Sequence, residues 1–87
     1  MQKKTDLHIG NIICEHLKKD GRSKKWLAGK VCCEYSSFCK MLKNQFLDTE
    51  LLLRISFVLQ YDFFTHFSKY IAENKIKMAN IYHNYSK

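Results

Sequence analysis

The side chains with the clearest capacity for chemistry are the lysines of residues 24–44, KKWLAGKVCCEYSSFCKMLKN. This stretch contains five lysines, and Glu34 is its only acidic residue. Residues 18–45 contain eight basic and two acidic residues, a net charge of +6, whereas residues 46–73 contain two basic and four acidic residues, a net charge of −2. Positive charge gathered in one segment is typical of proteins that bind a polyanion, although the same charge can simply keep a surface solvated.

The other reactive side chains follow no catalytic or metal-binding pattern. The cysteines at 14, 32, 33 and 39 lack the Cys-x-x-Cys spacing of a zinc site, and the four histidines are scattered. We therefore expect reduced cysteines that pack as small apolar residues. The spacing of Cys39 and His16 does not support a dyad, and the sequence has no Ser/His/Asp set or phosphate-binding loop. We expect neither an enzyme nor a metal or cofactor.

Length and composition indicate a single small helical domain. The chain has 87 residues, no proline and three glycines, which argues against a β-sandwich or barrel because those folds need many tight turns. No secretory segment follows Met1, and no apolar run reaches the ~20 residues that span a bilayer. We expect a cytoplasmic protein without a membrane partner.

Hydrophobic spacing predicts three helices around the lysine-rich segment. The first is expected over residues 7–19, with Asp6 as N-cap and Gly21 in the left-handed conformation after its end. The second is expected over about 24–31 with Ser23 as N-cap, and the third over about 35–43. Together these helices should present the lysines on their outer faces.

Two further helices complete the expected all-α fold of five helices. Asp48 or Thr49 is expected to cap a fourth helix, which is apolar on almost all sides and should be buried. Asp62 is expected to cap the fifth. We expect residues 1–72 to form the domain, and 73–87 to form a polar tail or an extension of the fifth helix.

A heptad-like spacing runs from the fifth helix into the tail. Its positions alternate steps of three and four residues: Phe64, Phe67, Ile71, Asn74, Met78, Ile81 and Tyr85. A longer fifth helix that pairs two chains explains this spacing. The alternative is a frayed polar tail with incidental apolar residues.

The second and third expected helices have the spacing of a helix-turn-helix. Leu27 and Val31 lie on one face of the second helix, and Ala28 is small enough to let the two helices approach closely. Cys33 falls between the helices and should point inward. We expect Trp26 to pack the second helix against the fourth or fifth, the alternative being a contact beside a DNA backbone.

Residues 7–68 resemble the Cro/CI-type family, also called Xre-like or lambda-repressor-like. The resemblance rests on "IGNIICEHLKKDGRSKKWLAGKVCCEYSSFCKMLKN" followed by "DTELLLRISFVLQYDFF", including the Leu27-Ala28 pair, the hydrophobic spacing and the leucine-rich helix. It implies a compact five-helix domain that is usually dimeric, binds double-stranded DNA and regulates transcription. It also implies that residues 35–43 form the recognition helix in the major groove.

The resemblance assigns roles to individual residues of this chain. Base edges would be read by Tyr35, Ser36 and Lys40, and Ser37 would lie near phosphate or bases. Backbone phosphates would be contacted by Lys24 and, past the third helix, by Lys43 and Asn44. Independently of the resemblance, counterion release favours Lys25 as a further phosphate contact, whereas Arg22 fits a solvated surface equally well.

Three positions depart from the family pattern. Cys32 replaces the usual glycine of the turn, where a positive φ costs a side chain about 1 kcal/mol and so favours a different turn conformation. Glu34 replaces the usual serine or threonine N-cap, so it should cap less well and place a negative charge near DNA. Lys24 replaces the usual glutamine and acts as a point charge rather than an amide clamp.

Two functions from different classes follow from these patterns. The first is sequence-specific DNA binding by a repressor-like homodimer associated with the nucleoid. The second is a protein-interaction module, such as an antitoxin-like subunit, that acts through the fifth helix and the tail. Charge reversal at Lys40 and Lys43 distinguishes them, because it should abolish only the first activity.

Overall fold

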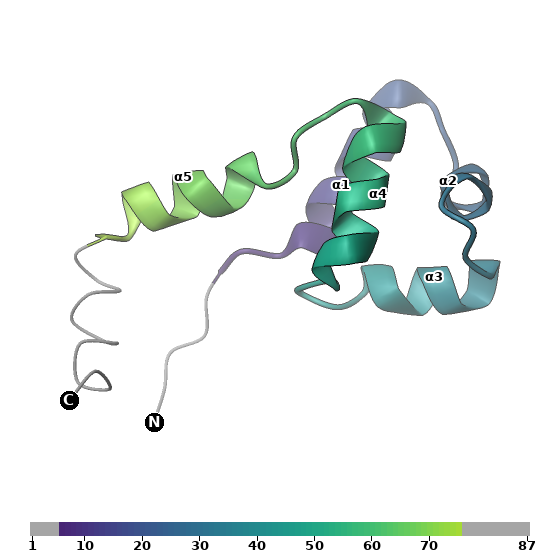
Figure 1. The fold of residues 1–87 in the computed structure, drawn as a ribbon, viewed down its shortest axis with the longest axis horizontal. Coiled ribbons are helices and arrows are strands. Elements are labelled where there is room, and N and C mark those ends of the chain that lie inside the picture. Colours follow the sequence, from purple (N-terminus) through teal and green to yellow (C-terminus); the bar gives the residue numbers. More distant parts are fainter. Residues whose placement is uncertain (1–5, 76–87) are drawn as a thin grey trace.

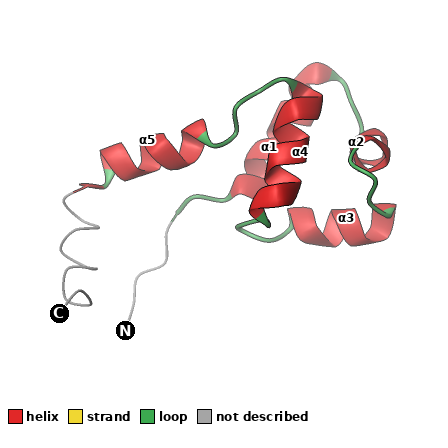
Figure 2. Ribbon diagram, in the orientation of Figure 1, coloured by secondary structure: helices red, strands yellow, loops and turns green. Residues whose placement is uncertain are grey.

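Five α-helices make up the regular structure of residues 6–75, the part of the chain that the computed structural model describes (Figure 1). They are α1 (Ile9–Asp20), α2 (Lys24–Lys30), α3 (Tyr35–Leu42), α4 (Thr49–Leu59) and α5 (Thr65–Glu73). The described residues form helices and loops but no strand (Figure 2). The expectation of an all-α fold is therefore confirmed, and the ends of the first three helices differ from prediction by one or two residues.

Three caps form as the sequence predicts: side-chain caps at the start of α2 and of α4, and a glycine cap at the end of α1. The Ser23 Oγ accepts a hydrogen bond from the Trp26 N–H at 3.0 Å and so caps α2. The Asp48 carboxylate accepts from the Leu51 N–H at 3.2 Å and caps α4. Gly21 follows α1 with a φ of 69°, the left-handed conformation that glycine adopts without strain.

The predicted caps of α1 and α5 are wrong. His8 caps α1, because its Nδ1 accepts a hydrogen bond from the Asn11 N–H at 3.0 Å, whereas Asp6 lies outside the helix. The α5 helix begins at Thr65, beyond the reach of an Asp62 cap. The Asp62 Oδ1 instead accepts from the Phe64 N–H at 3.0 Å and holds the turn that precedes α5.

The core forms where α1 and α4 meet the α2–α3 pair. Its twelve buried side chains are Ile9, Ile13, Leu17, Leu27, Ala28, Val31, Phe38, Leu42, Leu51, Leu52, Ile55 and Phe63. The expectation of a buried fourth helix is confirmed for one face of α4 only, the face that carries Leu51, Leu52 and Ile55. Leu53 and Phe57 on its other face are 46% and 72% exposed.

The α5 helix lies to one side of the other four, on the far side of α1 and α4 from α2 (Figure 1). None of its residues is buried. Phe67 packs at the edge of the core, and its ring centroid lies 6.1 Å from that of Phe46. The predicted continuation of the heptad-like spacing at Met78, Ile81 and Tyr85 lies outside the described residues.

Candidate nucleic-acid interface

The α2 and α3 helices are joined by residues 31–34 and share buried side chains. Leu27 and Ala28 from α2 and Phe38 from α3 are at most 1% exposed. The Cys33 N–H donates to the Ala28 carbonyl at 2.9 Å, which closes the connection onto the end of α2. Cys33 itself is partly buried, as predicted, with its Sγ 3.8 Å from the Val31 carbonyl oxygen. These contacts fix the position of α3 relative to α2.

The connection between the two helices keeps a left-handed residue although it has no glycine. Cys32 has a φ of 61°. The expectation that a cysteine here favours a different conformation is therefore wrong. The surrounding hydrogen bonds and the packing of Val31 outweigh a local cost of about 1 kcal/mol.

Arg54 anchors this connection to α4, a role that the sequence did not indicate. Its Nη1 donates to the Val31 carbonyl at 3.1 Å, and its Nη2 lies 2.9 Å from the Glu50 carboxylate. The hydrogen bond and charge of Glu50 raise the pKa of Arg54. The i, i+4 spacing of Glu50 and Arg54 on a helix predicts their ion pair, but the carbonyl that Arg54 reaches depends on the tertiary fold.

Trp26 packs α2 against the body of the molecule, as the sequence predicts. It is partly buried against the core and borders the same hollow as Val58 and Leu59 at the end of α4. The guanidinium carbon of Arg22 lies 4.1 Å from the centroid of the tryptophan ring, within the range of a cation–π contact. Arg22 therefore contributes to packing as well as to surface charge.

The predicted base-reading residues are exposed on α3. Ser36, Lys40 and Lys43 are spaced i, i+4 and i+7, so they lie on one face of α3, with Lys43 as its C-cap residue. Tyr35 is 47% exposed and lies one turn before Cys39. A hydrogen bond with Cys39 raises the pKa of the Tyr35 phenol, so this side chain lies along α3.

Glu34 binds the two serine hydroxyls at the start of α3 instead of capping the helix. The Ser36 and Ser37 hydroxyls each donate to one carboxylate oxygen of Glu34 at 2.9 Å. These bonds, first that of Ser36 and then that of Ser37, lower the pKa of Glu34. The Ser37 backbone N–H lowers this pKa by a smaller amount. No N–H of the first turn makes a cap hydrogen bond to the carboxylate, so Glu34 caps poorly, as predicted. Both serine hydroxyls consequently present acceptor lone pairs to solvent.

Ser37 on α3 is exposed, and so are the other predicted phosphate-contacting residues, which lie at two separate places. Lys24 and Lys25 form the first turn of α2, whereas Lys43 and Asn44 follow the end of α3. No lysine of residues 18–43 forms an ion pair within the part of the chain that the structure describes. Their positive charge is therefore available to an anionic partner.

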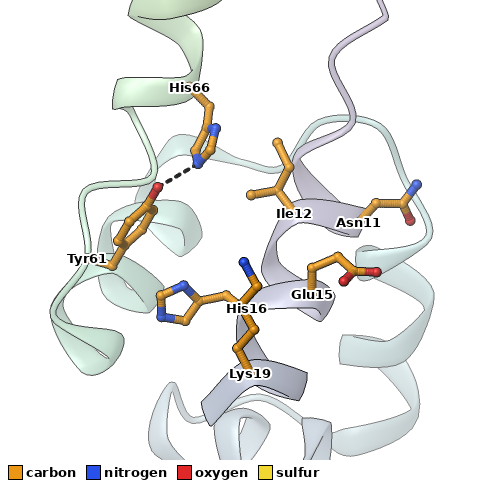
Figure 3. Close-up of a pocket in the computed structure, with 7 residues that line it drawn as sticks. All are labelled: Asn11, Ile12, Glu15, His16, Lys19, Tyr61 and His66. Carbon is orange, nitrogen blue, oxygen red and sulfur yellow. Dashed lines mark hydrogen bonds between the residues drawn. The ribbon is translucent and has the colours of Figure 1, made fainter.

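A second polar cluster, which sequence reasoning missed, lies between α1, the α4–α5 connection and the start of α5 (Figure 3). It surrounds a cavity of about 230 Å³. The Tyr61 hydroxyl and His66 Nε2 are 2.8 Å apart, and the His16 ring centroid lies 4.8 Å from that of Tyr61. Burial, followed by the charge of Lys69, lowers the pKa of His66. Among residues 6–75 no group of three metal-ligating side chains occurs.

Comparisons with protein-family models, curated proteins and solved structures give no match to this chain. The similarity to the Cro/CI-type family therefore stays a prediction from the quoted residues. Within residues 6–75, no helix combines the length and apolar character needed to cross a membrane.

Proposed function

We propose that this chain is a sequence-specific double-stranded DNA-binding protein of the Cro/CI type, a repressor-like regulator of transcription that is associated with the nucleoid. In this proposal α2 and α3 form a helix-turn-helix, and α3 enters the major groove while α2 crosses the backbone. One observation carries the proposal. All eight predicted contact residues are exposed on α2, on α3 or directly after it, and the lysines among them have no ion-pair partner in residues 6–75.

Base readout would come from the shared face of α3. The Lys40 ammonium can donate to the O6 and N7 acceptors of guanine, for about 1–3 kcal/mol of discrimination. Because the Ser36 hydroxyl already donates to Glu34, Ser36 can accept a hydrogen bond from cytosine N4 or adenine N6. The Tyr35 ring can contact a thymine methyl group at the edge of the same face.

Phosphate contacts would position the domain on the duplex. Lys24, Lys25 and Lys43 supply positive charge, and the Asn44 amide can donate to a phosphate oxygen. Ser37 can donate to a phosphate only after its hydroxyl leaves Glu34. Since one α3 covers only a few base pairs, we propose a homodimer that reads two half-sites about one helical turn apart.

Selection from a random duplex library, with the retained DNA sequenced, tests this function. We expect a palindromic sequence to be enriched, and the Lys40→Ala variant to lose the preference at one base pair in each half-site. The Lys69→Ala variant is the matched control, because it removes an exposed lysine from α5. Salt-sensitive retention without an enriched sequence would refute specific readout, and no retention at low salt would refute DNA binding.

The second candidate function is a protein-interaction module such as an antitoxin-like subunit. It is favoured by α5, which has no buried residue and exposes 62% of Ile71. Reversing the charge of Lys40 and Lys43 together should abolish DNA binding and leave such a protein complex intact. Substitution of Ile71 should disrupt such a protein complex and leave DNA binding intact.

A further inference from the structure

The outer face of α4 exposes an apolar ridge that the proposed DNA contacts do not use. Phe57 is the most exposed of the large apolar side chains in residues 6–75, at 72%, and Leu53 one turn earlier is 46% exposed. The opposite face of the same helix is buried in the core through Leu52 and Ile55. A phenylalanine that adds nothing to the core and faces water is typical of a contact surface.

Phe57 separates two hollows that differ in charge. The hollow on one side, of about 390 Å³, is bordered by Lys30, which has no ion-pair partner in residues 6–75, and by Arg54, whose charge is paired with Glu50. The hollow on the other side, of about 460 Å³, is bordered by Asp62 together with the apolar Leu53. Phe57 borders both hollows, so the same surface has a protruding ring and a recess next to it.

We propose that this face binds a second copy of the chain across a twofold axis that lies in the contact plane and passes beside Phe57. Rotation about this axis places each side of the ridge on one copy opposite the other side of the ridge on the second copy. Asp62 of each copy then faces the hollow bordered by Lys30 of the other copy, so the same pair of opposite charges forms twice. A surface that is complementary to itself in this way is what a twofold homodimer requires.

This interface would leave the proposed DNA contacts free. None of the eight predicted contact residues borders either hollow. Phe57 belongs to the C-terminal half of α4, whereas α3 leads into the N-terminal end of that helix (Figure 1). The inference rests on the homodimer of the proposed function, and it is tested without DNA so that the two can fail separately.

Sedimentation equilibrium of the full chain over a range of concentrations measures the association directly. We expect the wild-type protein to dimerise and Phe57→Ala to raise the dimer Kd by about 30-fold or more, the effect of removing an interface hot spot. Because Phe57 is largely exposed, circular dichroism should show an unchanged helical fold. The matched control is Ile71→Ala, which shortens an exposed apolar side chain on α5 and should leave the Kd unchanged.

Two results would overturn the proposed interface. A wild-type protein that stays monomeric at every concentration excludes it. A dimer that withstands Phe57→Ala but is lost on Ile71→Ala places the contact on α5 instead.

Charge exchange tests the twofold arrangement itself. Lys30→Glu should weaken self-association because the new carboxylate faces Asp62 of the second copy, and Asp62→Lys should weaken it because two lysines then face each other. Both positions are exposed. Mixing the two variants restores both opposite-charge pairs, so we expect mixed dimers to form more tightly than either variant alone. Mixed dimers no tighter than the variants alone would refute this pairing.

Discussion

The connection between α2 and α3 depends on a residue that is poorly suited to its conformation. Cys32 has a φ of 61° in a position where a Cβ atom crowds the backbone. It is exposed, and its side chain is not part of the core. Its neighbour Val31 is buried, and the Val31 carbonyl binds Arg54. The packing around Cys32 therefore holds the strained backbone in place.

Replacing Cys32 with glycine should stabilise the protein. Glycine adopts a positive φ without the steric cost, so we expect Cys32→Gly to raise the free energy of unfolding by about 0.5–1 kcal/mol. Urea denaturation followed by circular dichroism measures the change. Cys39→Gly is the contrasting control, since a glycine inside α3 should lower stability by about 1 kcal/mol. A Cys32→Gly protein no more stable than wild type would show that the backbone there is unstrained.

At the scale of the helices, the start of α1 is fitted closely against the end of α3. The Ile9 N–H donates to the Gln45 carbonyl at 2.8 Å. A Cβ atom on Gly10 would overlap the Leu42 carbonyl and lie 2.7 Å from the Asn44 carbonyl oxygen. Only glycine permits this approach, which brings α1 against the segment that follows α3 and carries Lys43 and Asn44.

We expect Gly10→Ala to destabilise the protein, because the added methyl group meets backbone atoms that cannot move away without shifting α3. The expected loss is about 1–3 kcal/mol, the usual cost of overpacking. Gly29→Ala is the matched control: this glycine lies inside α2, where an added Cβ would point into open space. It should gain about 0.5–1 kcal/mol from helix propensity. Chemical denaturation of both variants checks the pair, and equal effects would contradict the close contact.

Local sequence signals predicted the helices better than the contacts between them. Ser23 and Asp48 cap α2 and α4 as expected, because a cap needs only a short side chain next to the first turn. The contact at Gly10 and the bond from Arg54 to the Val31 carbonyl join segments distant in sequence, so no local pattern reveals them. In the candidate site the exposure of Lys40 followed from helical spacing. The hydrogen bonds from both serine hydroxyls to Glu34 depend on side-chain rotamers that the sequence does not specify.

The first turn of α5 contains a group whose protonation opposes folding, the imidazole of His66. Burial and the nearby charge of Lys69 lower the pKa of His66 from its ordinary value of 6.5, while Asp62 acts in the opposite direction. As pH falls through 6.5, the unfolded chain takes up a proton on this imidazole before the folded chain does. Stability is therefore full above pH 6.5 and decreases as pH falls toward the folded pKa.

We expect the free energy of unfolding of the wild-type protein to decrease between pH 7.5 and pH 5.5, and that of His66→Gln to decrease less. Glutamine keeps a hydrogen-bonding group for the Tyr61 hydroxyl but does not titrate. Lys69→Gln serves as a second variant, because removing its charge should reduce the shift and give an intermediate slope. Urea titrations at a series of pH values measure the slopes. Parallel profiles for wild type and His66→Gln would contradict this role.

The whole molecule separates its charge along the chain and across the fold. The basic segment, residues 18–45, forms α2, α3 and their flanks, whereas α4 and α5 belong to the acidic segment, residues 46–73. In the described structure α5 lies on the far side of α1 and α4 from α2 (Figure 1). A polyanion attracted to the basic segment would thus approach α2 and α3, which is the orientation that the proposed function requires.

The slope of DNA affinity against salt concentration should depend on the number of lysines that contact phosphates. Each contact releases about one counterion, so Lys24→Ala, Lys25→Ala and Lys43→Ala should each reduce the slope of log K against log salt by about one. Lys69→Ala changes net charge by the same amount on α5 and should leave the slope unchanged. Fluorescence anisotropy with one duplex at several salt concentrations gives all the slopes. A loss of slope in Lys69→Ala equal to that of the α2 and α3 variants would mean that total charge, not the position of α2 and α3 on the duplex, governs binding.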